Sequence, residues 1–237
     1  KNFFNINKKI FINKLSPVYK AIQQTRQTLS KEKSLISFIG APWTLLVYMF
    51  GLKRNKNELD LLKLKKKYKE INEILSELTE YLCTHIEQQV NAGADVVQIF
   101  DSWAGLIPEE NLKELCLEPN LKIVEYCKKI NTPVICFPKG IKENYKQFND
   151  FVKPNALSLD SEINPLWAKA NLKNVVLQGG MDPKILLKPE KEIYEEAKKY
   201  LDTFKDVPYI FNLGHGLIPE TEPEKVKNLI KFVREYK

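Results

Sequence analysis

Five short segments rich in glycine and polar side chains follow apolar runs of the sequence, and their residue types could do chemistry. These segments are residues 40–44, 100–105, 137–140, 178–183 and 212–216. In a parallel α/β fold the catalytic residues gather at the carboxyl ends of the strands. We therefore expect these segments to line a site and not to form part of the core.

His215 carries the clearest signal among them. It lies between Gly214 and Gly216, where the backbone can turn tightly and a ligand can approach closely. A neutral imidazole can donate or accept a hydrogen bond, and an imidazolium can pair with a carboxylate. The alternative is a loop histidine that caps the final helix. His85, the other histidine, falls in the middle of a predicted helix, where a place at the surface or at the edge of the core is expected.

Tyr48 and Ser102 offer hydroxyl groups near two other strand ends. Asp101 and Ser102 end a predicted strand, and Tyr48 follows Trp43 within the first turns of a predicted helix. Either hydroxyl could bind a polar substrate, although Tyr48 could equally pack as an aromatic whose hydroxyl meets a backbone carbonyl. Ser102 lacks a GxSxG turn, which argues against a serine hydrolase. Asp101 and Asp182 are left open between functional and structural turn residues.

The sequence predicts neither a metal site nor a cofactor. Cys83 and His85 stand two residues apart on a predicted helix, so they would point to different faces, and no second His/Cys cluster completes a zinc site. There is no GxGxxG segment after a strand and no Walker A loop. The four cysteines form no CxxC pair, which suits reduced thiols in a cytoplasmic protein.

The charge pattern argues against nucleic-acid and membrane partners. The net charge is +7, but 37 basic residues are interleaved with 30 acidic ones along the chain. The most basic stretch, residues 53–69 with a lysine run at 65–67, has no aromatic residues interleaved with its lysines to stack bases, so we interpret it as a solvated surface. No apolar run approaches the roughly 20 residues that a membrane span needs.

Apolar periodicity predicts alternating strands and helices. Helices are expected over residues 16–29, opening at a Ser-Pro pair, and 71–93. The last helix is expected to open with Thr221 and Glu224 at capping-box spacing. Its predicted apolar face consists of Val226, Leu229, Ile230 and Val233. The predicted strands cover residues 35–39, 95–100, 133–137, 156–159, 175–177 and 209–212.

This alternation indicates a parallel sheet covered by helices, with about six βα units where a closed barrel needs eight. Two architectures remain: an open doubly wound sheet, or a (β/α)8 barrel whose first strands lie upstream of Lys1. The absence of an initial methionine favours the barrel. We find no linker or repeat, so residues 1–237 are expected to form one barrel domain that is truncated at its N-terminus.

In this order, the strand-end segments resemble the signatures of the uroporphyrinogen decarboxylase family. The resemblance begins near Tyr19 and covers most of the chain. It runs through the segments FIGAPWTLLVYM, GADVVQIFDSWAG, PVICFPKG, LQGGMDP and FNLGHGLIPETEPEKV.

The resemblance implies a single (β/α)8 barrel that usually forms a homodimer and uses no cofactor. Such an enzyme removes CO2 from the four acetate side chains of uroporphyrinogen III to give coproporphyrinogen III. Protonation of a pyrrole carbon lets the substrate act as its own electron sink. The protein then has mainly to orient a large polyanion and to stabilise transient positive charge.

The resemblance also assigns substrate-binding roles to Tyr48, Ser102 and His215, and we expect all three to converge on one cleft. The arginine-rich motif and the catalytic aspartate of the family precede the region seen here, so we expect the 237-residue chain to be inactive by itself. Gly180 stands where the family usually has asparagine.

Two alternatives accompany this interpretation. One is a corrinoid-dependent or cobalamin-independent methyltransferase of the same barrel superfamily, which would need a thiolate-rich zinc site whose HxC element does not occur here. The other is a non-catalytic tetrapyrrole-binding protein descended from the enzyme.

Overall fold

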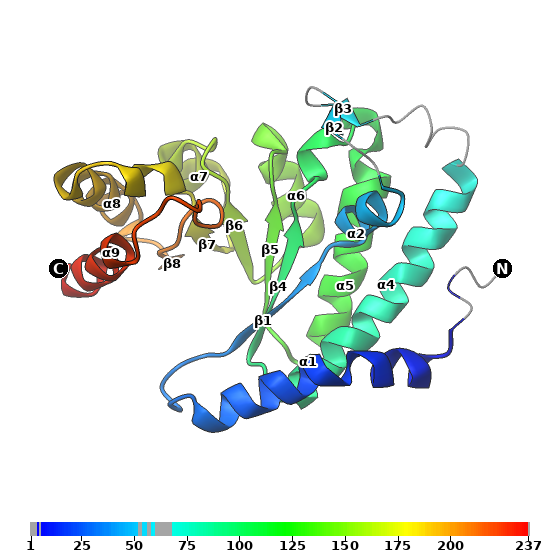
Figure 1. Ribbon diagram of the computed structural model, residues 1–237. Helices are drawn as coiled ribbons and strands as arrows, with labels where there is room; N and C mark the ends of the chain where they lie inside the picture. Colours follow the sequence, from blue (N-terminus) through cyan, green and yellow to red (C-terminus); the bar gives the residue numbers. More distant parts are fainter. Residues whose placement is uncertain (1–3, 5, 52–53, 56–57, 60–67, 237) are drawn as a thin grey trace. The chain divides into compact units, whose positions relative to one another are not determined.

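The computed structural model describes residues 4, 6–51, 54–55, 58–59 and 68–236, and Figure 1 shows its ribbon. The chain divides into two compact units, Lys1–Asn155 and Ala156–Lys237. Each unit contains three parallel strands with helices between them. The lysine run at residues 65–67 lies outside the described residues, and the expected single-domain organisation stays a prediction.

In the first unit the parallel strands follow the order β1-β4-β5. Their bounds are Ile36–Gly40 for β1, Val96–Asp101 for β4 and Val134–Pro138 for β5. The register aligns Gly40 with Phe100 and Asp101 with Pro138, so the three strands end together. A separate two-residue antiparallel pair consists of β2, Arg54–Asn55, and β3, Glu58–Leu59.

Helices precede and connect these strands. The longer ones are α1 (Lys8–Thr28), α2 (Pro42–Met49), α4 (Tyr68–Asn91), α5 (Glu118–Lys129) and α6 (Tyr145–Val152). The short turns are η1 (Ala104–Leu106), η2 (Glu109–Asn111), the π-helical η3 (Lys113–Leu117) and η4 (Lys142–Asn144). Figure 1 shows α1 at the end of the sheet where β1 and β4 begin, whereas α2 follows directly where β1 ends. The connections α2 and η1 therefore lie at the carboxyl ends of the strands.

The two faces of β1 differ in burial. Ser37 and Ile39 are buried and α4 packs against the strand, whereas Phe38 is 66% exposed. On the Phe38 face the rings of Phe38, Phe100 and Phe137 form a row of edge-to-face contacts with centroids 5.7 and 6.1 Å apart. One face of β1 is therefore covered by α4, whereas the face with Phe38 is apolar and partly exposed.

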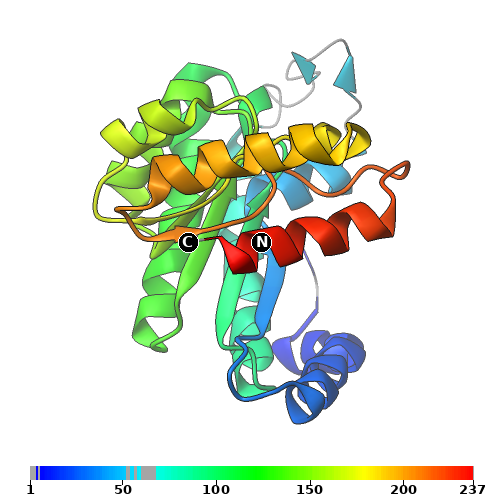
Figure 2. The same ribbon diagram turned by 90° about the vertical axis from the view of Figure 1, so that its left-hand side faces the viewer.

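The second unit contains strands in the order β6-β7-β8, again parallel. Its strands are β6 (Ala156–Leu159), β7 (Val176–Gly179) and β8 (Tyr209–Ile210). Its helices are α7 (Pro165–Asn171), η5 (Pro183–Leu187), α8 (Glu190–Phe204) and α9 (Pro223–Glu235). Figure 2 shows α9 lying alongside α8, and the rings of Tyr194 and Phe232 stack across this contact at 4.6 Å.

Two helix starts differ from the sequence-based prediction. The predicted helix at residues 16–29 begins at Lys8, because the Asn7 side chain caps it by accepting a hydrogen bond from the Ile10 N–H. Pro17 is thus inside α1, where packing of Phe11 and Tyr19 on α4 compensates for the hydrogen bond that proline cannot donate.

The last helix begins at Pro223 with Glu222 as its N-cap, so the predicted capping box at Thr221 is wrong. Proline at the first helical position already has the φ that a helix needs, and the Thr221 hydroxyl has no hydrogen-bond partner. The predicted apolar face is also only partly buried: Leu229 is buried, but Ile230 is 46% exposed.

Candidate functional site

Helix α2 places a tyrosine at the carboxyl end of the first sheet. Ala41 is its N-cap and Pro42 occupies the first helical position, so the GAPWT segment ends β1 and starts α2 within two residues. Trp43 and Thr44 are buried in the first turn, whereas Tyr48, one turn later, is 62% exposed. The buried residues fix the helix, and the phenol faces outward.

Asp101, the last residue of β4, is a buried carboxylate surrounded by hydrogen-bond donors. Asp101 is only 1% exposed. The Thr44 hydroxyl donates to Oδ1 at 2.8 Å, and the Cys116 thiol and Asn120 amide donate to Oδ2 at 3.4 and 3.3 Å. Burial raises the pKa of Asp101 to about 6, and these hydrogen bonds oppose that shift.

A π turn brings Cys116 and Asn120 onto the carboxylate. The two residues are four apart, so they lie on one face of the continuous helix made by η3 and α5. Pro119 has no N–H to donate to the Leu115 carbonyl. The helix widens here to a π turn, in which the Glu118 N–H donates to the Lys113 carbonyl five residues earlier. Burial raises the pKa of the Cys116 thiol well above its usual value, so this group is a neutral donor.

The loop after β4 is tied to α2 through Trp103. Its backbone N–H donates to the Thr44 hydroxyl at 3.3 Å, and its carbonyl accepts from the Trp43 indole N–H at 3.1 Å. The Trp103 ring meets the Tyr48 ring edge-on, with centroids 6.0 Å apart. Ser102, which is half-buried, directly precedes Trp103. Tyr48 and Ser102 therefore belong to one local assembly, and their predicted role in substrate binding stays a prediction.

Lys139 flanks the same loop and was given no role from the sequence. Its N–H donates to the Asp101 carbonyl at 3.1 Å, and its carbonyl accepts from the Gly105 N–H at 2.9 Å. Continuing the register beyond Asp101 and Pro138 places Lys139 beside Ser102. A Cβ on Gly105 would lie 2.5 Å from the Gly140 carbonyl oxygen, so glycine is needed for this close approach. The FPKG segment thus brings the backbone of Lys139, a half-buried residue, next to Ser102.

In the second unit, His215 is exposed on a loop whose base is fixed. The Gly214 N–H donates to the Met181 carbonyl at 2.7 Å, and Met181 forms a parallel bridge with Leu213. A Cβ on Gly214 would lie 2.6 Å from the Ser161 nitrogen. The glycine before His215 therefore permits close packing of the backbone against Ser161. Convergence of His215 with Tyr48 and Ser102, which lie in the first unit, stays a prediction.

The turn after β7 contains Gly180 and Asp182, whose surroundings the structure describes. Asp182 caps η5 by accepting from the Lys184 N–H at 2.9 Å, which gives it a structural role in the turn. Gly180 has φ +103°, and a Cβ there would lie 2.9 Å from the Tyr200 ring. The Tyr200 hydroxyl donates to the Gly180 carbonyl at 2.8 Å. An asparagine side chain would clash at this place.

The remaining candidates lie away from the strand ends. His85 is half-buried on α4 between the Tyr19 hydroxyl, 3.0 Å from Nδ1, and the Gln89 amide, 2.7 Å from Nε2. Burial lowers its pKa, which suits the predicted place at the core edge. Cys83 lies nearby on α4, and burial raises the pKa of its thiol to about 11. Within the described residues no cluster of three His, Cys, Asp or Glu side chains could hold a metal ion.

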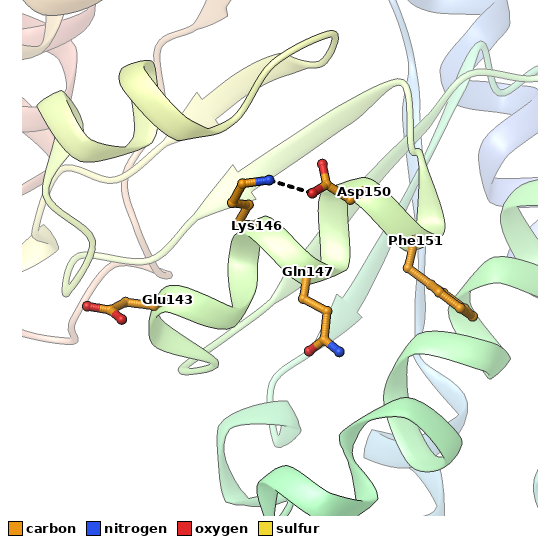
Figure 3. Close-up of a pocket in the computed structure, with 5 residues that line it drawn as sticks. All are labelled: Glu143, Lys146, Gln147, Asp150 and Phe151. Atoms are coloured by element: carbon orange, nitrogen blue, oxygen red, sulfur yellow. Dashed lines mark hydrogen bonds and ion pairs between the residues drawn. The ribbon is translucent and has the colours of Figure 1, made fainter.

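A shallow concavity also lies on the surface of α6. Figure 3 shows its five side chains, all from η4 and α6, with Lys146 and Asp150 paired along the helix at 2.6 Å. Phe151 lies under the Lys113 ammonium at 5.8 Å. Such a surface pair is typical of a solvated helix and marks no site. No helix of the described chain is long and apolar enough to cross a membrane.

Comparison with known proteins identifies close sequence relatives. A family model described as uroporphyrinogen decarboxylase matches residues 3–236. Proteins named uroporphyrinogen decarboxylase from Rickettsia bellii, Orientia tsutsugamushi and Wolbachia pipientis wMel are each 38% identical to the chain, over 94%, 99% and 94% of its length. The chain spans 67%, 70% and 66% of these relatives, about two thirds of their length.

Solved structures support the predicted fold class. A methyltransferase from Methanosarcina mazei superposes with a TM-score of 0.74 at 20% identity, over 92% of this chain and 64% of that one. A B12-independent methionine synthase from Shewanella sp. W3-18-1 gives a TM-score of 0.61 at 12% identity, over 91% and 64%. At such low identity the likeness concerns the fold alone. The prediction of an incomplete (β/α)8 barrel is confirmed, and the open doubly wound sheet is set aside.

Proposed function

Because the chain belongs to the uroporphyrinogen decarboxylase family, we propose that it takes part in the decarboxylation of uroporphyrinogen III to coproporphyrinogen III in tetrapyrrole synthesis. The observation that carries this proposal is the family match over residues 3–236. The reaction removes CO2 from four acetate side chains. The protein that contains this chain is the proposed catalyst.

In this proposal the chain binds and orients the substrate. The phenol of Tyr48, the hydroxyl of Ser102 and the imidazole of His215 can each donate a hydrogen bond to a carboxylate without adding a fixed negative charge. The exposure of Tyr48 and His215 leaves both groups accessible to a ligand. The rigid frame behind Tyr48 and Ser102 supports this role, since positioning of a bound substrate can lower a barrier by several kcal/mol.

The chemistry of the substrate removes the need for a cofactor in this scheme. A protonated pyrrole accepts the electron pair released as each CO2 leaves, and a proton then replaces the carboxyl group. In this scheme the residues described here have the binding role.

A homodimer in the cytoplasm completes the proposal. The four cysteines are free thiols, three of them buried, which fits a reducing compartment. Light scattering after size exclusion tests the dimer, and a monomeric mass would refute it.

The activity is tested with protein made from the complete reading frame that encodes this chain. The protein is incubated anaerobically with uroporphyrinogen III, and the products are separated by their number of carboxyl groups. We expect loss of four carboxyl groups without added metal or cofactor. Binding without turnover would instead indicate a tetrapyrrole-binding protein, and turnover that needs zinc and a methyl donor would indicate a methyltransferase.

A further inference from the structure

The two hydroxyl groups assigned to substrate binding in the first unit come from different elements. Tyr48 is on α2, which is only eight residues long, and Ser102 is on the loop after β4. A short helix gains little stability from its own hydrogen bonds. The relative position of Tyr48 and Ser102 therefore depends on side-chain contacts between α2 and the loop.

Thr44 makes the central contact of this kind. Its hydroxyl donates to Asp101 Oδ1 at 2.8 Å and accepts from the Trp103 N–H at 3.3 Å. A carboxylate can only accept hydrogen bonds, so Asp101 directs the Thr44 proton toward itself and leaves the oxygen lone pairs for the Trp103 N–H. One hydroxyl thus joins α2, the end of β4 and the loop.

The geometry of α2 transmits this anchor to Tyr48. Thr44 and Tyr48 are four residues apart, so their side chains lie on one face of the helix, about one turn from each other. The Trp103 ring, whose backbone Thr44 holds, contacts the Tyr48 ring. Displacement of Thr44 would therefore shift Tyr48 and Ser102 relative to each other.

We propose that Thr44, oriented by the buried Asp101 carboxylate, is a positioning residue that sets Tyr48 and Ser102 in register for one polycarboxylate substrate. The proposal rests on the substrate roles given to Tyr48 and Ser102 above. Asp101 and Thr44 touch no substrate in this scheme. Their effect is on the arrangement of the groups that do.

The test compares Thr44→Val with a matched control, Thr79→Val, in the complete gene product. Both threonines are 4% exposed, and both are on helices of the first unit. The Thr79 hydroxyl donates only to the Leu75 carbonyl of its own helix, at 2.6 Å. Each valine removes one buried hydroxyl at nearly constant volume, so the pair separates loss of stability from loss of positioning. Thr44→Ser restores the hydroxyl.

We expect Thr44→Val to lower kcat/KM for uroporphyrinogen III by about tenfold or more, since small displacements of positioned groups have effects of this size. Thr79→Val should stay within about twofold of the parent, and Thr44→Ser should recover most of the loss. Near-ultraviolet circular dichroism sums the signals of all aromatic rings, including the coupled Tyr48 and Trp103 rings, and should change most in Thr44→Val.

Equal effects of Thr44→Val and Thr79→Val on kcat/KM would overturn the proposal. If the parent protein has no turnover, the proposed function fails. Circular dichroism is then the measurement that tests whether Thr44 positions Tyr48 and the loop. An aromatic spectrum that Thr44→Val leaves unchanged would refute the positioning role, and a change that is largest in Thr44→Val would support it.

Discussion

The buried carboxylate of Asp101 should make the stability of the first unit depend on pH in an unusual direction. Burial raises its pKa from 3.8 to about 6. The titratable groups facing it, Cys116 and Cys136, have raised pKa values of their own and stay neutral in this range. The folded state therefore binds a proton between pH 4 and pH 6 that the unfolded state has released.

The sign and size follow from linkage. Where the folded state holds more protons, the free energy of unfolding falls as pH rises, by up to about 1.4 kcal/mol per pH unit for one group. The rise of the Asp101 pKa from 3.8 to about 6 gives a loss of about 3 kcal/mol in the free energy of unfolding between pH 4 and pH 6, and no further loss above pH 6. In Asp101→Asn this contribution disappears. The variant minus parent difference in unfolding free energy should rise by about 3 kcal/mol over that interval.

Urea unfolding at several pH values from 4 to 7.5 measures the difference. In a Trp167→Phe background, Trp43 and Trp103 are the remaining tryptophans, and both are in the first unit. Asp150→Asn, which removes an exposed carboxylate of the same unit, serves as the control and should give a flat difference curve. A flat curve for Asp101→Asn, or one that falls with rising pH, would refute the account of Asp101.

Three further predictions concern other contacts. Gly105→Ala places a Cβ 2.5 Å from the Gly140 carbonyl oxygen and should lower the unfolding free energy by about 2 to 3 kcal/mol in urea titrations; a loss below 0.5 kcal/mol would contradict the close packing. Because the Lys139 backbone adjoins Ser102, we expect its ammonium to pair with a substrate carboxylate, so Lys139→Gln should raise KM for uroporphyrinogen by about threefold to tenfold with little change in kcat. Lys139→Arg should restore KM, and an unchanged KM would remove Lys139 from the site. Tyr200→Phe removes the donor to the Gly180 carbonyl and should destabilise the chain by about 1 kcal/mol by thermal unfolding, whereas an unchanged Tm would show that the carbonyl finds another partner.

The strands were predictable because local signals coincide with their tertiary role. Each predicted strand overlaps an observed one, and β6 matches residue for residue. Most of the strands are short apolar runs that end at glycine or proline, and β5 and β6 are buried at every residue. At Gly40 and Pro138 those end signals are also the strand ends in the structure.

The helix starts were less predictable because several residues compete to cap a helix. Ser16-Pro17 has the form of a start, yet Asn7 provides an earlier one. Aromatic packing of α1 on α4, between Phe11 and Tyr81, extends the helix past the proline. Tertiary contacts thus override a local signal that is valid in isolation.

The hydrogen bonds around Asp101 could not be predicted from the sequence. The family resemblance gave substrate roles to Tyr48 and Ser102, which stay predictions, and it gave no role to Thr44 or Asn120. The hydrogen bonds of Asp101 span 57 residues to Thr44 and 19 to Asn120, so the set forms only when the strand register and a π turn bring them together. The available signal was Asp101 itself, since a carboxylate at the end of an apolar strand must find donors when it is buried.

That requirement explains why a carboxylate stands at this position. An apolar residue in place of Asp101 would avoid the cost of burying a charge, which is about 3 kcal/mol at neutral pH on the linkage argument. It would also leave the Thr44 hydroxyl and the Asn120 amide without their buried acceptor, and unsatisfied groups of this kind cost about 1 to 3 kcal/mol each. The two terms are similar in size, so stability does not decide the choice. What the carboxylate adds is direction: it fixes the Thr44 proton, and through Thr44 it fixes the loop that carries Ser102.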